Sequence, residues 1–66
     1  MNVKMKSKRV LLGLSQEDLA KQIGVSRQTI ILIEKEAYNP SLKLCVAICK
    51  ALTTTLDELF WEEEEQ

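Results

Sequence analysis

The chain has 66 residues, enough for one small hydrophobic core, so we expect one domain over residues 1–66. Hydrophobic residues make up 45% of the sequence. No apolar stretch approaches the roughly 18 residues that a membrane-spanning helix needs, which excludes that class of protein. The lysine-containing start is not followed by an apolar run and a cleavage site, so we expect no signal peptide and a cytoplasmic location.

The net charge of −1 hides an uneven distribution of charge. All nine basic residues lie in residues 1–56, which contain only four acidic residues, whereas residues 57–66 contain six acidic residues and no basic one. The chain therefore combines a basic body with an acidic tail, residues 62–66. A basic body favours a phosphate-rich partner, because the local field matters more for binding than the total charge.

The sequence lacks the residues that most enzymes and metal sites use. There is no histidine, and Cys45 and Cys49 are the only cysteines, so zinc would lack two ligands. Four residues apart on a predicted helix, these cysteines are interpreted as small buried side chains. The carboxylates of Glu17, Asp18 and the run 62–65 are interpreted as solvated surface. We therefore expect no enzyme, no metal and no cofactor.

The first predicted helix covers about residues 4–12 and ends at Gly13. Met5, Arg9 and Leu12 recur at helical spacing and are expected to face inward.

Two short helices joined by a tight turn at Gly24 are predicted next. Ser15 and Asp18 form a capping-box pattern for the first of them, and Ser26 caps the second. The expected buried side chains are Leu19, Ala20, Ile23, Ile30 and Ile33.

The segment Tyr-Asn-Pro (38–40) breaks the chain, and Ser41 caps a fourth helix over about residues 42–52. Thr55 and Glu58 cap a short fifth helix, about 56–60. Residues 60–63 could form an extended segment that pairs with residues 1–3. The fold class is thus all-α with five helices, with that short terminal β-ribbon as a possible addition. The fourth helix is expected to bury Leu42, Cys45, Ile48, Cys49 and Leu52.

The second helix of the tight-turn pair opens with polar side chains suited to a DNA major groove. The guanidinium of Arg27 matches guanine O6 and N7, and the amide of Gln28 matches adenine N6 and N7. Gln16 and the free N–H groups that start a helix can bind phosphate oxygens. The alternative is that these residues form an ordinary solvated helix face.

These motifs, in this order and spacing, resemble the Cro and phage-repressor (XRE-type) helix-turn-helix family over nearly the whole chain. Residues 5–16 are similar to the first helix and the start of the second in lambdoid-phage repressors. Similarity to compact single-domain bacterial members lies in Gly-Val-Ser-Arg-Gln-Thr-Ile (24–30), Ile-Glu-Lys (33–35), Tyr-Asn-Pro-Ser-Leu (38–42) and Leu-Asp-Glu-Leu-Phe (56–60).

The resemblance implies roles for individual residues. It implies a partly buried structural ion pair between Arg9 and Glu34, and double-stranded DNA as the partner. Together with the residue chemistry, it gives a predicted DNA-binding set of Gln16, Ser26, Arg27, Gln28, Thr29, Leu32, Tyr38, Asn39, Ser41 and Lys43. The predicted homodimer interface is Asn39, Leu56, Leu59, Phe60 and Trp61.

The chain departs from the family pattern in two places. Glu36 and Ala37 stand where relatives have a glycine followed by a polar or basic residue, which could lengthen the third helix. Ile31 and Leu32 lie off the buried stripe, where relatives carry polar side chains. Leu32 could contact a thymine methyl group, or equally be an incidental exposed apolar residue or part of a small partner patch.

The leading functional hypothesis is a sequence-specific transcriptional repressor that binds a palindromic operator as a dimer. The alternative is an antitoxin-like or adaptor module that uses the same fold to bind another protein. Ile31, Leu32 and the acidic tail would suit that alternative. A steep salt dependence of binding would distinguish DNA from a protein partner.

Overall fold

The computed structural model describes residues 2–60, which form five α-helices and no β-strand. The predicted all-α class is confirmed. The suggested extended pairing of residues 1–3 is wrong at Val3, because Val3 is the first residue of the first helix. Its suggested partners, residues 61–63, lie outside the described residues. The helices are α1 (Val3–Leu11), α2 (Gln16–Ile23), α3 (Arg27–Glu34), α4 (Leu42–Ala51) and α5 (Leu56–Phe60).

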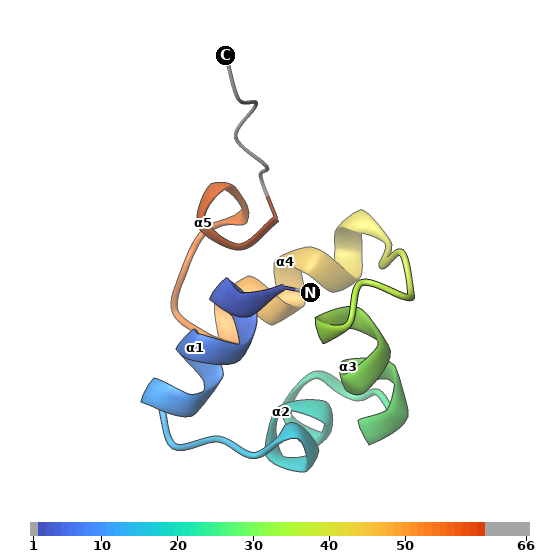
Figure 1. Ribbon diagram of the computed structural model, residues 1–66, viewed down its shortest axis with the longest axis horizontal. Helices are drawn as coiled ribbons and strands as arrows, with labels where there is room; N and C mark the ends of the chain where they lie inside the picture. Colours follow the sequence, from blue (N-terminus) through green and yellow to red (C-terminus); the bar gives the residue numbers. More distant parts are fainter. Residues whose placement is uncertain (1, 61–66) are drawn as a thin grey trace.

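The five helices enclose one core, with α4 linking the two sides of the molecule (Figure 1). On one side α1 packs against α5, and on the other α2 packs against α3. Helix α4 contacts both α2 and α5, and α1 also contacts α3. This arrangement leaves the beginnings of α2 and α3 at the surface.

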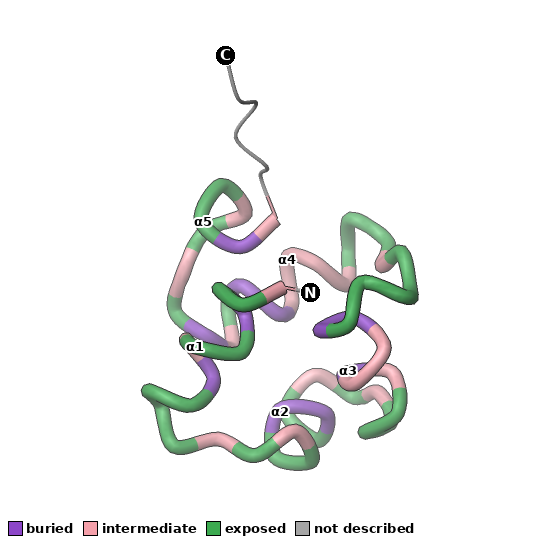
Figure 2. Tube along the Cα trace, viewed as in Figure 1, coloured by how far each residue is buried: buried purple, intermediate pink, exposed green. Residues whose placement is uncertain are grey.

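The core contains side chains from all five helices, and the buried segments face the interior of the bundle (Figure 2). Burying an aliphatic side chain of this size contributes about 1.5–3 kcal/mol. The buried apolar residues are Met5, Leu19, Ala20, Ile30, Ile33, Ile48, Cys49, Leu52 and Leu59.

Two leucines that the sequence pattern assigns to the core are exposed. Leu12 is 48% exposed because α1 ends at Leu11 and helical periodicity no longer directs the next side chain. Leu42 is 69% exposed because it is the first residue of α4, whose buried residues begin only at Ile48. Ile23 and Cys45, also predicted to be buried, are half-buried.

Each of the five helices begins with a side chain that accepts a hydrogen bond from the backbone three residues later, and for α5 this is the predicted cap Thr55, which accepts from the amide of Glu58. Ser15, Ser26 and Ser41 do so for α2, α3 and α4, as the sequence predicted. Asn2 does so for α1, and its own backbone and side-chain N–H groups donate to the carbonyls of Glu34 (2.7 Å) and Leu59 (3.1 Å). Asn2 therefore joins the start of α1 to the ends of α3 and α5.

Just after each of the first four helices, one residue adopts a left-handed backbone conformation with positive φ. Two are glycines, Gly13 and Gly24, but the other two are Glu36 (φ 62°) and Thr53 (φ 56°). After α3, the amides of Glu36 and Ala37 donate to carbonyls of that helix, which closes it. The replacement of glycine by Glu36 therefore does not lengthen α3, which ends at Glu34.

The Thr53→Gly variant is expected to raise the free energy of unfolding by about 0.5–1 kcal/mol. A β-branched residue at positive φ is strained, and glycine removes that strain at some cost in chain entropy. For a domain of this size the midpoint of thermal unfolding should rise by roughly 2–8 °C. Gly13→Ala is the matched control at the end of α1, and it should lower the midpoint. A fall in the Thr53→Gly midpoint would contradict the strain argument.

Candidate nucleic-acid interface

The turn between α2 and α3 exposes the start of α3. Gly24 has φ 76°, and the amide of Val25 donates to the carbonyl of Ala20 at 3.0 Å. Ala20 is buried, and its small side chain allows the two helices to approach closely. Helix α2 packs against α3 more extensively than any other pair. The turn and this packing fix the direction of α3.

The side chains in the first turn of α3 are of two kinds: some bond to each other, and others form no bond within residues 2–60. The Ser26 hydroxyl accepts from the amide of Thr29 (3.2 Å) and lies 2.9 Å from the Thr29 hydroxyl. Arg27 and Gln28 are exposed, and neither side chain is bonded within residues 2–60. The donors of these two residues are therefore the ones available to an external ligand.

A buried polar cluster supports this turn from below. Arg9 donates from Nε to Glu34 Oε2 (2.8 Å) and from Nη1 to the carbonyl of Leu14 (2.9 Å). Gln16 Nε2 donates to Glu34 Oε1 at 3.1 Å. Arg9 and Glu34 are only 7% and 4% exposed, so α1, α2 and α3 are tied together by charged groups shielded from water.

The cluster continues outward into a surface depression. Arg9 and Gln16 form part of its lining, together with residues from the starts of α2 and α3 and one residue of α1. Two of its lining side chains, Lys6 and Arg27, are basic and come from different helices. The lining residues are Lys6, Arg9, Ser15, Gln16, Glu17 and Arg27.

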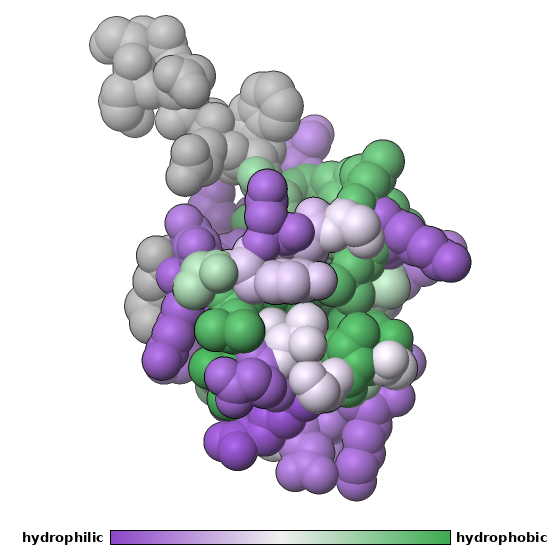
Figure 3. All heavy atoms as spheres, turned by 90° about the vertical axis from the view of Figure 1, so that its right-hand side faces the viewer, coloured by the Kyte–Doolittle hydropathy of each residue, from purple (hydrophilic) through white to green (hydrophobic). Residues whose placement is uncertain are grey.

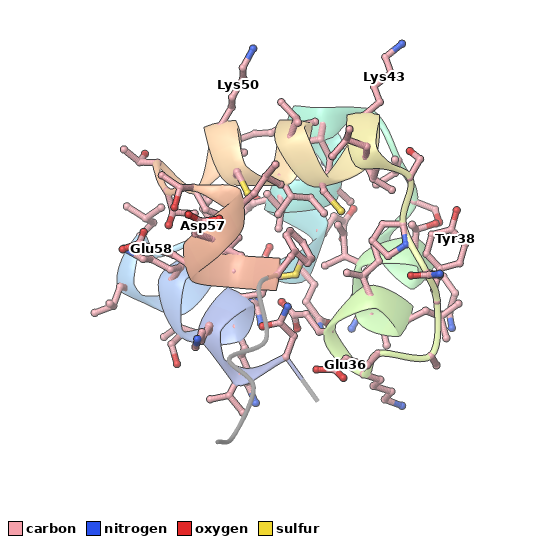
Figure 4. All side chains as sticks on the ribbon, turned by 90° about the horizontal axis from the view of Figure 1, so that it is seen from above. Glu36, Tyr38, Lys43, Lys50, Asp57 and Glu58 are labelled. Carbon is pink, nitrogen blue, oxygen red and sulfur yellow. The ribbon has the colours of Figure 1, made fainter. Side chains whose placement is uncertain are left out.

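The predicted phosphate contacts after α3 are all at the surface. Tyr38, Asn39, Ser41 and Lys43 are exposed, and the hydroxyl of Ser41 accepts from the amide of Leu44. Tyr38 lies on the loop after α3 and Lys43 extends outward from α4 (Figure 4).

Helices α2 and α3 form the lower edge of the molecule in Figure 1. On the face shown in Figure 3, the side chains along this lower edge are mostly hydrophilic. Leu32, the apolar member of the predicted set, is only half-buried. It therefore keeps some surface for a ligand.

The predicted dimer residues differ in their accessibility. Leu56 and Phe60 are half-buried against the core, whereas Leu59 is 4% exposed and has almost no surface to offer to a partner. Asn39 is exposed, and Trp61 lies outside the described residues.

The acidic side chains of α5 lie away from the α3–α4 loop. Asp57 and Glu58 are at the opposite end of the molecule from Tyr38 (Figure 4). The hydroxyl of Thr54 hydrogen-bonds to Glu58, and this contact, with the nearby charge of Lys8, lowers the pKa of Glu58 below its usual value. The positive charge of α1 on this side is thus partly offset.

Acid should weaken the start of α2. The amide of Ser15 donates to Asp18 Oδ2 (3.0 Å), and this bond, followed by the one to the Ser15 side chain, lowers the pKa of Asp18. A lowered pKa in the folded state means that the stabilisation is complete above the unfolded value of about 3.9 and is lost as pH falls through the folded value.

In acid-unfolding experiments, Asp18→Asn should therefore show a smaller loss of stability below about pH 4 than the parent chain. Asp57→Asn removes the same charge from a residue without this cap contact, and it serves as control. Equal pH profiles for Asp18→Asn and the parent chain would contradict the prediction.

The two cysteines are free thiols, and burial raises the pKa of each. Their thiolate forms are therefore disfavoured. Among residues 2–60 no helix is long and apolar enough to cross a membrane.

The helix-turn-helix family model matches residues 5–59, which contain the turn, the polar cluster and the loop after α3. The chain belongs to the XRE-type helix-turn-helix family. Members of this family are DNA-binding transcriptional regulators. The family membership that the motifs indicated is therefore confirmed.

Relatives of this helix-turn-helix chain occur in bacteria and archaea. It is 48% identical over 65 residues to the uncharacterized HTH-type transcriptional regulator YgzD of Bacillus subtilis, covering 98% of each chain. It is 50% identical over 66 residues to the uncharacterized HTH-type transcriptional regulator MJ0272 of Methanocaldococcus jannaschii, covering 100% of each. A third such regulator, from Methanothermobacter thermautotrophicus, is 42% identical over 66 residues.

Proposed function

We propose that this helix-turn-helix protein is a transcriptional repressor that places the start of α3 in the major groove of its operator. One observation carries the proposal: Arg27 and Gln28 are exposed and uncommitted at the start of a helix that the buried cluster holds in place. Direct readout requires a fixed helix whose uncommitted side chains can each form two hydrogen bonds to a base edge, as an Arg guanidinium and a Gln amide can. We take residues 1–66 as one domain that acts in the cytoplasm.

The other predicted DNA-binding residues differ in which hydrogen-bonding groups remain free to contact DNA. Ser26 and Thr29 bond to each other, so they mainly order the first turn of α3. The Gln16 side chain already donates to Glu34, which leaves its second amide hydrogen and its backbone N–H for a phosphate oxygen. The proposed phosphate contacts on the other side of the groove are Tyr38, Asn39, Ser41 and Lys43. Leu32 is proposed to approach a thymine methyl group.

A homodimer would allow the protein to read two half-sites. One α3 helix contacts only a few base pairs, whereas a two-fold dimer places two such helices about 34 Å apart on a palindrome. The proposed interface keeps Asn39, Leu56, Phe60 and Trp61 and omits Leu59, which is buried. Sedimentation with and without a 30-base-pair duplex would test this, and a complex with one chain per duplex would contradict it.

A protein partner is the second candidate, because α1 exposes apolar side chains. Val10 and Leu11 of α1 are 58% and 81% exposed. Neither residue belongs to the proposed DNA-binding set. Such residues would suit an adaptor or antitoxin-like role.

The dependence of binding on salt separates the two candidates. A mixed-sequence 30-base-pair duplex is titrated with the purified chain at several KCl concentrations. DNA binding predicts that log K falls with log[salt], with a slope of about −0.9 for each phosphate neutralised. A flat response, or no binding at low salt, would favour the protein partner.

A further inference from the structure

We infer that Lys6 of α1 binds a phosphate of the DNA backbone and thereby helps to set the position of α3 in the groove. The inference rests on the proposed function, and it adds α1 to a contact surface that the motifs confine to α2, α3, the loop after α3 and the start of α4. It arises from the surface depression that Lys6 and Arg27 both line.

Lys6 projects from a different side of α1 than the other lysines of that helix. Successive residues turn by about 100°, so Lys4 lies roughly 200° from Lys6 around the helix axis. Lys4 and Lys8 both act electrostatically on Glu58 of α5. Lys6 instead lines the depression with Gln16 and Arg27. Helix α1 therefore directs one lysine toward the reading end of the molecule and the others toward α5.

Within residues 2–60, Lys6 and Arg27 form no ion pair with a neighbouring side chain. Of the other charged residues that line the depression, Arg9 is paired with Glu34. Glu17 lies 3.8 Å from Lys21 on the exposed side of α2. The depression is thus lined by two cations without an ion-pair partner in residues 2–60 and by one acid, Glu17, that is paired with Lys21.

The start of α2 adds hydrogen-bond donors to the same depression. The Ser15 hydroxyl caps the amide of Asp18, which leaves the amides of Gln16 and Glu17 at the exposed first turn. The positive end of the helix dipole favours an anion there. Two free cations beside outward-facing amides match a phosphate diester, and they match it whatever the base sequence.

Such a phosphate would lie beside the side chain that is proposed to read guanine. Lys6 and Arg27 line the same depression, so a backbone phosphate held by Lys6 fixes the distance from the backbone to the first turn of α3. The contact would contribute affinity without sequence preference. Its effect should therefore be separable from that of Arg27.

The test compares Lys6→Gln with Lys4→Gln, which removes the same charge from the same helix. Binding is measured from 50 to 300 mM KCl, on a duplex that the parent chain enriches from a random pool and on a shuffled duplex of equal length. Lys6→Gln should weaken binding to both duplexes by a similar factor, roughly 5- to 10-fold near 0.1 M salt, and reduce the salt slope by about 0.9. Lys4→Gln should leave the slope unchanged. Thermal unfolding checks that both exposed substitutions preserve the fold.

The other possible results contradict either the proposed function or the inference about Lys6 alone. If the parent chain enriches no duplex or responds little to salt, the proposed function fails and the inference with it. If the parent slope is steep but Lys6→Gln retains it, or Lys4→Gln lowers it equally, only the inference about Lys6 fails. A loss confined to the enriched duplex would also overturn the inference, because it would indicate a base contact.

Discussion

The Glu34→Ala variant is expected to lose about 3–5 kcal/mol of unfolding free energy, because it leaves Arg9 charged and buried without its partner. Arg9 would keep only its bond to the carbonyl of Leu14, and Gln16 would lose its acceptor. A domain of this length has roughly 3–10 kcal/mol of stability, so much of the population should unfold. Urea unfolding followed by circular dichroism measures the loss.

Replacing both charges should be far less harmful than replacing one. In the double variant Arg9→Met, Glu34→Leu, no unpaired charge remains, and substitution of a buried pair by apolar residues of similar size is often neutral or stabilising. Most of the stability should therefore return. A loss below about 1 kcal/mol in Glu34→Ala would show that water reaches Arg9 and would contradict the burial argument.

The Arg27→Ala variant is expected to weaken binding to the enriched duplex by about 1–3 kcal/mol, a factor of roughly 5 to 150. Its thermal unfolding should match that of the parent, because the Arg27 side chain is exposed and bonds to nothing within residues 2–60. Removal of a bidentate base contact reduces discrimination, so affinity for the shuffled duplex should fall much less.

This comparison also distinguishes base recognition from phosphate binding by Arg27, which lines the same depression as Lys6. Equal losses on both duplexes would assign Arg27 to the backbone and leave Gln28 as the base reader. Lys50→Ala is the control, because Lys50 lies at the opposite end of α4 from the proposed phosphate contact Lys43 (Figure 4). Equal binding of Arg27→Ala and the parent to the enriched duplex would contradict any contact by Arg27.

Local chemistry in the sequence was enough to predict most of the fold. The caps at Ser15, Ser26 and Ser41 and the glycines after α1 and α2 act within four or five residues, so their patterns are visible without a structure. The family model and the five helices agree with that interpretation.

Long-range contacts were harder to predict. Asn2 caps α1 but also bonds to Glu34 and Leu59, and no local pattern shows a contact across 57 residues. Leu12 and Leu42 follow the apolar period, yet each lies at a helix end where the period no longer determines burial. No local pattern placed Thr53 at positive φ, whereas Glu36 adopts it at a position where relatives carry a glycine.

The candidate site was only partly visible for the same reason. Its residues in α2 and α3 follow from the turn pattern, but Lys6 joins them only because α1 packs against α3. The bond from Gln16 to Glu34 likewise depends on three helices meeting. Sequence spacing predicted the DNA-reading helix, whereas its supports required the assembled fold.

The most direct test of the central claim is selection of bound sites from a random double-stranded DNA pool with the purified parent chain. We predict one enriched palindromic motif whose half-sites lie about one helical turn, or 34 Å, apart, and whose enrichment is lost with Arg27→Ala. Recovery of sequences no different from the starting pool, under salt conditions where the chain binds DNA, would contradict sequence-specific reading by α3.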